Sequence, residues 1–268
     1  MTRIIVAGAT GWTGRAVAEA VLAADDLTLV GAVARSAAGR DLGDVLGRPA
    51  PLGLTVAATV EEALASAPAD VLIDYTKPGV VKGHVLAAVA RGVAAVVGTS
   101  GLTAEDFAEI DAAARAQGVG VVASGNFALT AALLSHFSLI AARYIEHFEI
   151  IDYAKAAKPD APSGTARELA ERLGDVRRPA LGLPLDQVTG SREARGGTIN
   201  GVQVHSVRLP SFAATVDALF TVGNSRLKIT HDAGADATIY ADGTLLAARR
   251  VKDVTGVVRG LDTLLFGG

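Results

Sequence analysis

The stretch from residue 158 to residue 166, Lys-Pro-Asp-Ala-Pro-Ser-Gly-Thr-Ala, has the residue types and spacing of an anion-binding site. Two prolines favour a turn, and the alanine-rich run that follows has the spacing of a helix beginning near Ser163, Gly164 and Thr165. The first turn of a helix presents backbone N–H groups without partners, which together with two hydroxyls can bind a carboxylate or a phosphate. Lys158 would add a positive charge. An ordinary capped helix beside a solvated lysine is the alternative interpretation.

Composition limits what such a site can belong to. The chain has 268 residues, 50% hydrophobic and 20% charged, which is enough for one large domain or two small ones. A net charge of -3 without a basic run argues against a nucleic-acid partner. The absence of cysteine excludes disulfides and thiolate chemistry, and the five histidines lack metal-ligand spacing, so we predict no metal site. We find no signal peptide and no apolar run of about 20 residues, and therefore expect a soluble cytoplasmic protein with no membrane contact.

A second chemical signal lies near the N-terminus. Gly8, Gly11 and Gly14 stand three residues apart between a β-branched run, residues 3–7, and a helical pattern, residues 15–22. In the dinucleotide-binding fingerprint the first glycine makes a tight turn, the second lets the backbone approach a pyrophosphate, and the third lets helix and strand pack closely. A glycine turn needed only for packing is the alternative. We predict that a cofactor also contacts the intervening residues Thr10, Trp12 and Thr13.

The residues after the second predicted strand bear on which cofactor is bound. NAD-specific proteins often place an acid at this strand end, where it binds the ribose 2′-hydroxyl. Here residues 27–33 are followed by Ala34, Arg35 and Ser36, and an arginine with a serine suits a 2′-phosphate. We therefore expect NADPH, with NADH as the alternative cofactor. A solvated surface arginine would also explain Arg35.

Further candidate cofactor residues follow three later runs that we interpret as strands, residues 71–75, 94–98 and 119–123. Ligands of open α/β sheets bind at the carboxyl ends of the strands, where small side chains let a nicotinamide ring approach the backbone. Asp74 could instead cap the segment that follows its strand. The cofactor residues predicted at these strand ends are Thr76, Lys77, Gly98, Thr99, Ser100, Ser124, Asn126 and Phe127.

The order of these elements predicts two domains. Strands and helices alternate up to residue 127, which predicts an α/β, Rossmann-like domain with a parallel sheet covered on both faces. The pattern then changes to successive strands, which predicts an α+β domain built on a mixed or antiparallel sheet. The strands predicted in this second part lie near residues 148–153, 202–208, 213–222 and 226–232.

We place the dinucleotide-binding domain at residues 1–127 and a domain for substrate binding and oligomerisation at residues 128–243. The stretch from Thr244 to Phe266 has a helical pattern. We expect the C-terminal residues 244–268 to return to the first domain as a helix.

These motifs occur together in one known family. Their order and spacing resemble 4-hydroxy-tetrahydrodipicolinate reductase (dihydrodipicolinate reductase) over nearly the whole chain, and the run from Lys158 to Ala166 is highly specific to that family. The segments that carry the resemblance are the glycine turn at residues 8–14 and residues 73–78, 98–103, 126–127, 158–166, 227–231 and 243–249.

The resemblance implies a Rossmann-like domain and a substrate domain whose sheet assembles a homotetramer. It implies an oxidoreductase of lysine and diaminopimelate biosynthesis that reduces a small-molecule cyclic imine or enamine dicarboxylate, 4-hydroxy-tetrahydrodipicolinate, with NADPH or NADH. Mapped onto this sequence, Lys158 would be the catalytic lysine, and Ser163, Gly164 and Thr165 would hold a substrate carboxylate.

The chain departs from the family in the segment before Lys158. The family pattern Glu-x-His-His-x-x-x-Lys is replaced by Asp152, Tyr153, Ala154 and Lys155 followed by two alanines, so alanine stands where the general acid is expected. A proton donor typically accelerates such a reduction by about 10²–10⁴-fold. The remaining candidates are Lys155, Lys158 and Tyr153, although Lys155 could instead bind only a carboxylate.

Three other side chains of the second domain could meet the substrate. We assign His205, on an alternating strand, to substrate binding, although a lone histidine on a strand is more often structural. Arg195 and Arg208 could meet a second carboxylate, with a surface position favoured for Arg195.

Two further functions remain open. Ala154 and Lys155 suggest a divergent reductase of the same fold that acts on another imine or keto acid. The turn at residues 8–14 is also similar to that of atypical short-chain dehydrogenases, which suggests a non-catalytic, NADP-binding redox sensor. The predicted carboxylate site argues against the sensor, since a sensor does not need one.

Overall fold

The structure is a computed structural model that describes residues 1–267. The chain divides into two compact units. The first unit comprises Met1–Leu129 and the chain from Ala237 onward, and the second unit comprises Thr130–Asp236. Each unit has its own sheet and its own hydrophobic core.

The sheet of the first unit is parallel throughout, as the sequence predicted, with the strand order β11-β5-β4-β3-β1-β2. Most of its strands are short, fully buried runs of Val, Ile, Leu and Ala, which suits a sheet covered on both faces. The order reverses between β1 and β3, and ligands of such sheets bind beyond the carboxyl ends at that point. The strands are β1 (Thr2–Ala7), β2 (Leu27–Val33), β3 (Val71–Asp74), β4 (Ala94–Val97), β5 (Gly120–Ala123) and β11 (Gly256–Arg259).

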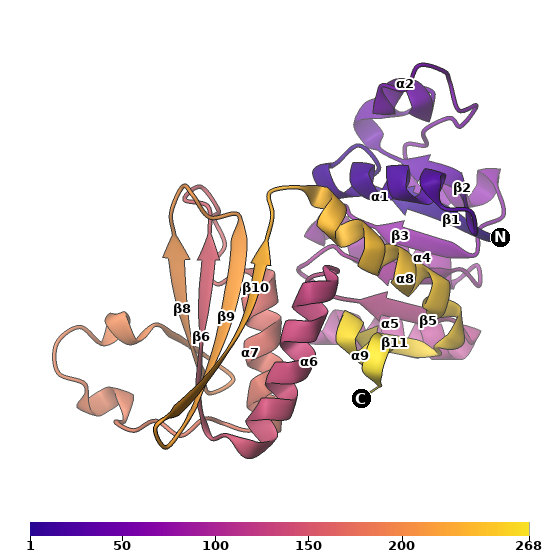
Figure 1. Cartoon of the computed structure of the whole chain (residues 1–268). Helices are drawn as coiled ribbons and strands as arrows, with labels where there is room; N and C mark the ends of the chain where they lie inside the picture. Colours follow the sequence, from indigo (N-terminus) through magenta and orange to yellow (C-terminus); the bar gives the residue numbers. More distant parts are fainter. Residues whose placement is uncertain (268) are drawn as a thin grey trace. The chain divides into compact units, whose positions relative to one another are not determined.

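Helices cover both faces of this sheet, which confirms the predicted α/β architecture (Figure 1). Helices α1 and α8 pack against each other on one face, and α3, α4 and α5 lie on the other. The helices are α1 (Trp12–Ala23), α2 (Leu42–Leu46), α3 (Val60–Ser66), α4 (Pro78–Val89), α5 (Ala104–Gln117), α8 (Ala241–Arg250) and α9 (Leu261–Phe266).

One expectation for the first unit is wrong. The stretch from Thr244 to Phe266 is not a continuous helix, because strand β11 separates α8 from α9 and pairs in parallel with β5. Gly256 begins the strand with a φ of 84°, and the amide of Val257 donates a hydrogen bond to Asp111 Oδ1 at 2.7 Å. A four-residue strand followed at once by a helix has too few residues to show an alternating pattern, so tertiary pairing decides its conformation.

The second unit is an α+β structure on a mixed sheet, as predicted, with the strand order β10-β9-β6-β8-β7. Strands β6 and β8 pair in parallel, and the other pairs are antiparallel. Helices α6 (Leu129–Tyr144) and α7 (Gly164–Val176) lie on one face of the sheet and share its apolar core (Figure 1). The strands are β6 (His147–Ala154), β7 (Gly197–Ile199), β8 (Val202–Arg208), β9 (Ala214–Val222) and β10 (Ser225–Ala233).

Strand β6 decides which side chains can meet at the site. Its burial alternates, with Phe148, Ile150, Asp152 and Ala154 buried on the face that packs against α6 and α7. Because successive side chains of a strand point to opposite faces, Tyr153 projects from the other face of the sheet. A carboxylate therefore stands in line with apolar core residues.

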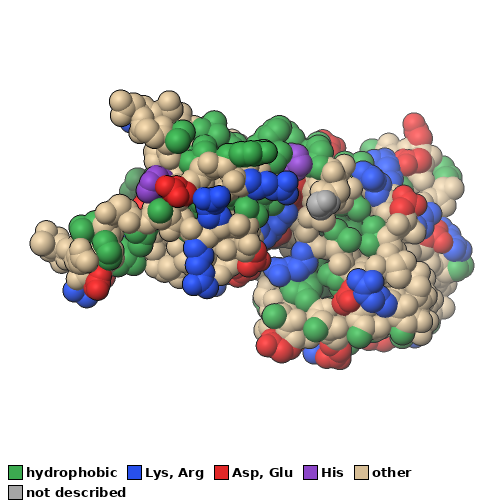
Figure 2. All heavy atoms as spheres, turned by 90° about the horizontal axis from the view of Figure 1, so that it is seen from below, with side chains coloured by type: hydrophobic (Ala, Val, Ile, Leu, Met, Phe, Trp, Pro, Cys, Tyr) green, Lys and Arg blue, Asp and Glu red, His purple; other side chains and the backbone are tan. Residues whose placement is uncertain are grey.

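The surface is of mixed character. On the face shown in Figure 2, Lys and Arg side chains lie among acidic and hydrophobic ones. Within residues 1–267, none of the helices combines the length and the apolar character that crossing a membrane requires.

Candidate functional site

The turn after β1 has a geometry that requires glycine. Gly8 has a φ of 83°, and a Cβ at this position would lie 2.2 Å from the carbonyl oxygen of Tyr75. A Cβ on Gly14 would lie 2.1 Å from the carbonyl oxygen of Gly8, closer than real Cβ atoms approach. The turn thus packs against the end of β3 and sets the N-terminus of α1 at the strand-order reversal, where it can face a pyrophosphate.

The other residues of this turn remain accessible. Thr10, Gly11 and Trp12 are exposed and Thr13 is half-buried. Trp12, the only tryptophan in the chain, is 61% exposed and meets the ring of Tyr240 edge to face, with centroids 5.9 Å apart. Its fluorescence is therefore a natural reporter of ligand binding at this turn.

A buried carboxylate joins the ends of β3 and β4. Asp74 is fully buried, and its Oδ1 accepts hydrogen bonds from the amide and hydroxyl of Thr76 at 3.0 and 2.7 Å and from the hydroxyl of Thr99 at 2.6 Å. Its Oδ2 lies 2.8 Å from Nδ1 of His84, a residue to which sequence analysis assigns no role. The structure brings together two predicted cofactor residues from different strands, and Asp74 positions both.

The predicted residues after β4 and β5 differ in their environments. A Cβ on Gly98 would lie 2.1 Å from the ring of Tyr75, so glycine is required there. The hydroxyl of Ser124 donates to the carbonyl oxygen of Asn126 at 2.9 Å and shapes the turn after β5. Phe127 is only 1% exposed and packs edge to face on Tyr75, so it supports the crevice from inside instead of contacting a cofactor as predicted.

The charged and hydroxyl candidates of the first unit are open to solvent. Arg35 and Ser36 follow β2 directly, in a short 3-10 turn, and both are exposed. Lys77 and Ser100 are also exposed, after β3 and β4. Together with the glycine turn, these positions could hold a dinucleotide.

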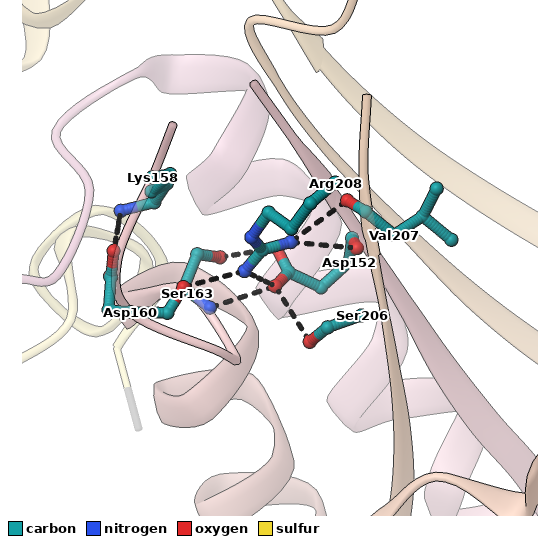
Figure 3. A network of polar contacts seen from close by, with 7 residues as sticks. All are labelled: Asp152, Lys158, Asp160, Ser163, Ser206, Val207 and Arg208. Atoms are coloured by element: carbon teal, nitrogen blue, oxygen red, sulfur yellow. Dashed lines mark hydrogen bonds and ion pairs between the residues drawn. The ribbon is translucent and has the colours of Figure 1, made fainter. Parts of the chain in front are cut away.

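In the second unit, the predicted anion site is built on a buried carboxylate (Figure 3). Asp152 is 1% exposed, and its Oδ2 accepts the backbone N–H of Ser163 at 2.8 Å while its Oδ1 accepts the hydroxyl at 2.6 Å. Ser163 is the residue before α7, so the carboxylate ties the N-terminus of this helix to strand β6. A negative charge is favourable at that end of a helix.

Strand β8 completes the network around Asp152 (Figure 3). The guanidinium of Arg208 donates through Nη2 to Asp152 Oδ2 and to the carbonyl oxygen of Asp160, both at 2.8 Å. Its Nη1 donates to the carbonyl oxygens of Val207 and Asp152 at 3.0 and 3.3 Å, and the hydroxyl of Ser206 donates to Asp152 Oδ2 at 3.2 Å. Arg208 meets a carboxylate, as the sequence suggested, but it is the protein's own.

Lys158 lies on the loop between β6 and α7. Its Nζ donates to both carboxylate oxygens of Asp160, at 2.5 and 2.7 Å (Figure 3). Burial alone would raise the pKa of Asp160, but the hydrogen bonds and charge of Lys158 outweigh burial and lower it below the ordinary value. The lysine side chain is 28% exposed, so it can still reach a ligand.

The anion site differs from the prediction in one respect. Sequence analysis expects Ser163, Gly164 and Thr165 to bind a carboxylate together, whereas both donors of Ser163 are engaged by Asp152. Ser163 therefore positions the helix, and the backbone amides of Gly164 and Thr165, in the first turn of α7, remain as the candidate ligands.

Two predicted site residues lie away from this cluster. Tyr153 projects from the opposite face of the sheet, stacks on Phe212 at a centroid distance of 4.9 Å, and has its pKa raised by burial and by Asp217. His205 belongs to the same opposite face, where its Nε2 lies 2.7 Å from Glu149 Oε2. The alternation along β6 was the sequence signal that separates these side chains from Asp152.

The remaining candidates flank the cluster. Lys155 is exposed, and its carbonyl oxygen accepts the amide of Lys158 at 3.0 Å in a turn. Ala154 is fully buried at the end of β6. Arg195 pairs with Glu149 beside His205. In the described part of the chain, no three His, Asp or Glu side chains are arranged to hold a metal ion.

Comparison with known proteins agrees with this arrangement. Residues 2–127 match dihydrodipicolinate reductase, N-terminus, and residues 130–265 match dihydrodipicolinate reductase, C-terminus. The chain belongs to the dihydrodipicolinate reductase family. The resemblance expected from the sequence is therefore confirmed, although Ala154 and Lys155 replace the histidine pair of the family pattern.

Individual relatives match over almost their full length. The 4-hydroxy-tetrahydrodipicolinate reductases of Desulfitobacterium hafniense and Moorella thermoacetica are each 38% identical over 264 residues, 98% of this chain and 98% and 97% of theirs. The dipicolinate-bound dihydrodipicolinate reductase of Paenisporosarcina superposes with a TM-score of 0.81 at 29% identity, covering 98% of this chain and 99% of that one. Both units thus share the architecture of a reductase that has been crystallised with a planar dicarboxylate.

Proposed function

We propose that the protein reduces 4-hydroxy-tetrahydrodipicolinate to tetrahydrodipicolinate in lysine and diaminopimelate biosynthesis, with NADPH as the preferred cofactor. The observation that carries this proposal is the N-terminus of α7 held by Asp152 beside Lys158, in a chain of the dihydrodipicolinate reductase family. In the net reaction the ring loses water and gains one hydride and one proton.

The residues of the first unit fit a nicotinamide dinucleotide. The turn from Gly8 to Gly14 leaves no room for side chains at its two ends and presents the first amides of α1 to a pyrophosphate. Thr76 and Thr99 would line the nicotinamide end, and Arg35 with Ser36 would bind a 2′-phosphate. When bound, the reduced nicotinamide supplies the hydride.

The second unit would bind and orient the dicarboxylate. The amides of Gly164 and Thr165 would donate to one carboxylate, because the first turn of a helix has N–H groups to spare. Lys158 would exchange its contact with Asp160 for the substrate, and Asp160 would hold the ammonium group in reach until then.

The proton donor is the least conventional part of this site. Ala154 has no proton to give, and Tyr153 lies on the other face of the sheet with a raised pKa. We assign the proton to Lys158, with Lys155 as the alternative, since both stand on the loop before α7 and both carry ammonium groups.

The activity is tested with the freshly made condensation product of pyruvate and aspartate semialdehyde. The purified protein should consume NADPH in its presence, and the rate should exceed that with NADH. Lack of NADPH consumption would remove the substrate assignment. Titrations followed by Trp12 fluorescence should give an NADPH affinity that falls about tenfold in Arg35→Ala, since a charged hydrogen bond is worth about 1.5–3 kcal/mol, while the NADH affinity stays unchanged.

The buried Ala154 supports a second candidate, a reductase of another cyclic imine or keto acid. A turnover scan across cyclic imines separates the two, because the second candidate predicts a better substrate than the condensation product. Tight NADPH binding without turnover of any compound would instead favour a redox sensor. We also propose a homotetramer, which the mass of the protein in solution, measured by light scattering, would test.

A further inference from the structure

Arg208 stands next to the position at which this chain departs from its family. Arg208 of β8 and Ala154 of β6 are partners in register, so their side chains start from neighbouring positions on the helix-facing side of the sheet. Ala154 contributes only a methyl group, and the guanidinium extends from beside it back to Asp152, two residues earlier on β6. The small residue thus leaves room for the arginine on this face.

The cost of burying this arginine argues for a role other than stability. Its side chain is 16% exposed, and its Nε is buried without a hydrogen-bond partner among residues 1–267. A buried ion pair is often no more stabilising than apolar residues of the same size, and an unpaired buried donor lowers stability further. Some other requirement must therefore explain why this pair lies against α7.

The charge of Asp152 supplies that requirement. The Asp152 carboxylate binds the amide and hydroxyl of Ser163, one residue before the amides of Gly164 and Thr165 that the proposed function assigns to a substrate carboxylate. Two neighbouring carboxylates repel each other, and the repulsion is strong where water is excluded. An uncompensated Asp152 would hold the helix in place but would also repel the substrate.

We infer that Arg208 is a positioning residue that neutralises Asp152, so that one buried carboxylate can anchor the N-terminus of α7 while a second carboxylate binds there. The inference rests on the proposed function. Arg208 also donates to the carbonyl oxygen of Asp160, so it ties the Lys158 loop to the same point. It sets the affinity for the dicarboxylate and does not contact the cofactor.

The test compares variants whose expected effects on dicarboxylate binding have opposite signs. Pyridine-2,6-dicarboxylate is titrated calorimetrically into the full-length protein, and the Kd for NADPH is measured in parallel. Arg208→Gln should raise the dicarboxylate Kd by about tenfold or more, because it leaves a buried like charge beside the ligand. Asp152→Asn, which keeps an oxygen for the Ser163 amide, should lower the Kd by about threefold or more, because the repulsion is gone and Arg208 remains. Neither variant should change the Kd for NADPH.

The double variant and the controls separate charge from structure. Asp152→Asn with Arg208→Gln restores neutrality, so its dicarboxylate Kd should return to within about threefold of the parent value. Arg208→Lys keeps the charge and should retain most of the affinity. Arg226→Gln, which changes an exposed arginine on β10 of the same unit, is the matched control and should bind like the parent.

The outcomes distinguish this inference from the proposed function. If Asp152→Asn weakens dicarboxylate binding as Arg208→Gln does, or if the double variant binds no better than Arg208→Gln, the pair is merely structural and the inference is wrong. Should Arg208→Gln fail to fold, the sign of the Asp152→Asn effect still decides. A parent protein that binds no dicarboxylate and does not turn over overturns the proposed function and this inference with it.

Discussion

The two candidate ligand sites are built in different ways. In the first unit the cofactor turn is a matter of backbone shape, since a Cβ on Gly8 or Gly14 would overlap backbone atoms. In the second unit the anion site depends on side chains, because Asp152 joins Ser163, Ser206 and Arg208 from three separate segments. A site made by backbone shape tolerates no change at a few positions, whereas a side-chain network can be rebuilt. The family's histidine pair is missing from the second site, while the glycine turn of the first is intact.

The largest effect is expected at Lys158, the one ammonium group placed beside the anion site by a described contact. Lys158→Ala should lower turnover by about 10²–10⁴-fold, the usual contribution of a proton donor, and leave the NADPH Kd unchanged. Steady-state kinetics and Trp12 fluorescence measure the two quantities. Lys155→Ala is the matched comparison and should lose far less activity. Equal losses in both variants, or none in Lys158→Ala, would contradict the assignment.

The backbone-made site should fail for a steric reason. Gly14→Ala places a Cβ 2.1 Å from the carbonyl oxygen of Gly8, so the turn must shift and NADPH affinity should be lost. Overpacking of this kind costs about 1–3 kcal/mol of unfolding free energy, measurable by urea titration. Gly83→Ala in α4 is the control, because no atom lies within 4 Å of its Cβ, and it should stabilise the protein by up to about 1 kcal/mol. Retained NADPH affinity in Gly14→Ala would show that the turn does not hold the cofactor.

Restoring the family's histidine sharpens the comparison further. Ala154→His puts an imidazole into a fully buried position beside Arg208, and should destabilise the second unit by about 1–3 kcal/mol without raising turnover. Urea unfolding and steady-state rates on the same sample provide the test. A faster, equally stable variant would mean that the network around Asp152 can accommodate the histidine.

The smallest expected effect is a pH dependence in the second unit. His231 is 2% exposed, lies 2.9 Å from Thr130 Oγ1 through Nδ1, and has its pKa lowered from 6.5 by burial. Because the unfolded chain binds the proton more readily, this residue's contribution to stability is complete above pH 6.5 and declines as the pH falls toward the folded pKa, by at most about 1.4 kcal/mol per pH unit. His231→Asn should therefore lose less unfolding free energy than the parent between pH 7 and pH 5. An identical loss in both proteins would refute this.

What the sequence could predict follows from the same contrast. The glycine turn and the buried parallel strands were predictable because their determinants lie within a few neighbouring residues. The role of Asp152 was not, because its partners Ser163, Ser206 and Arg208 lie 11, 54 and 56 residues away along the chain. The placement of Tyr153 was available from the alternation of Phe148 and Ile150 on β6, whereas β11 was too short to show any pattern.

A crystal structure with NADPH and pyridine-2,6-dicarboxylate tests the central claim most directly, namely that Asp152 and Arg208 hold the N-terminus of α7 ready for a carboxylate. We predict a ligand carboxylate with oxygens about 3 Å from the backbone nitrogens of Gly164 and Thr165. Asp152 should still accept the amide of Ser163 and still pair with Arg208. A dicarboxylate bound away from α7, or one that displaces Asp152 from Ser163, would contradict the account.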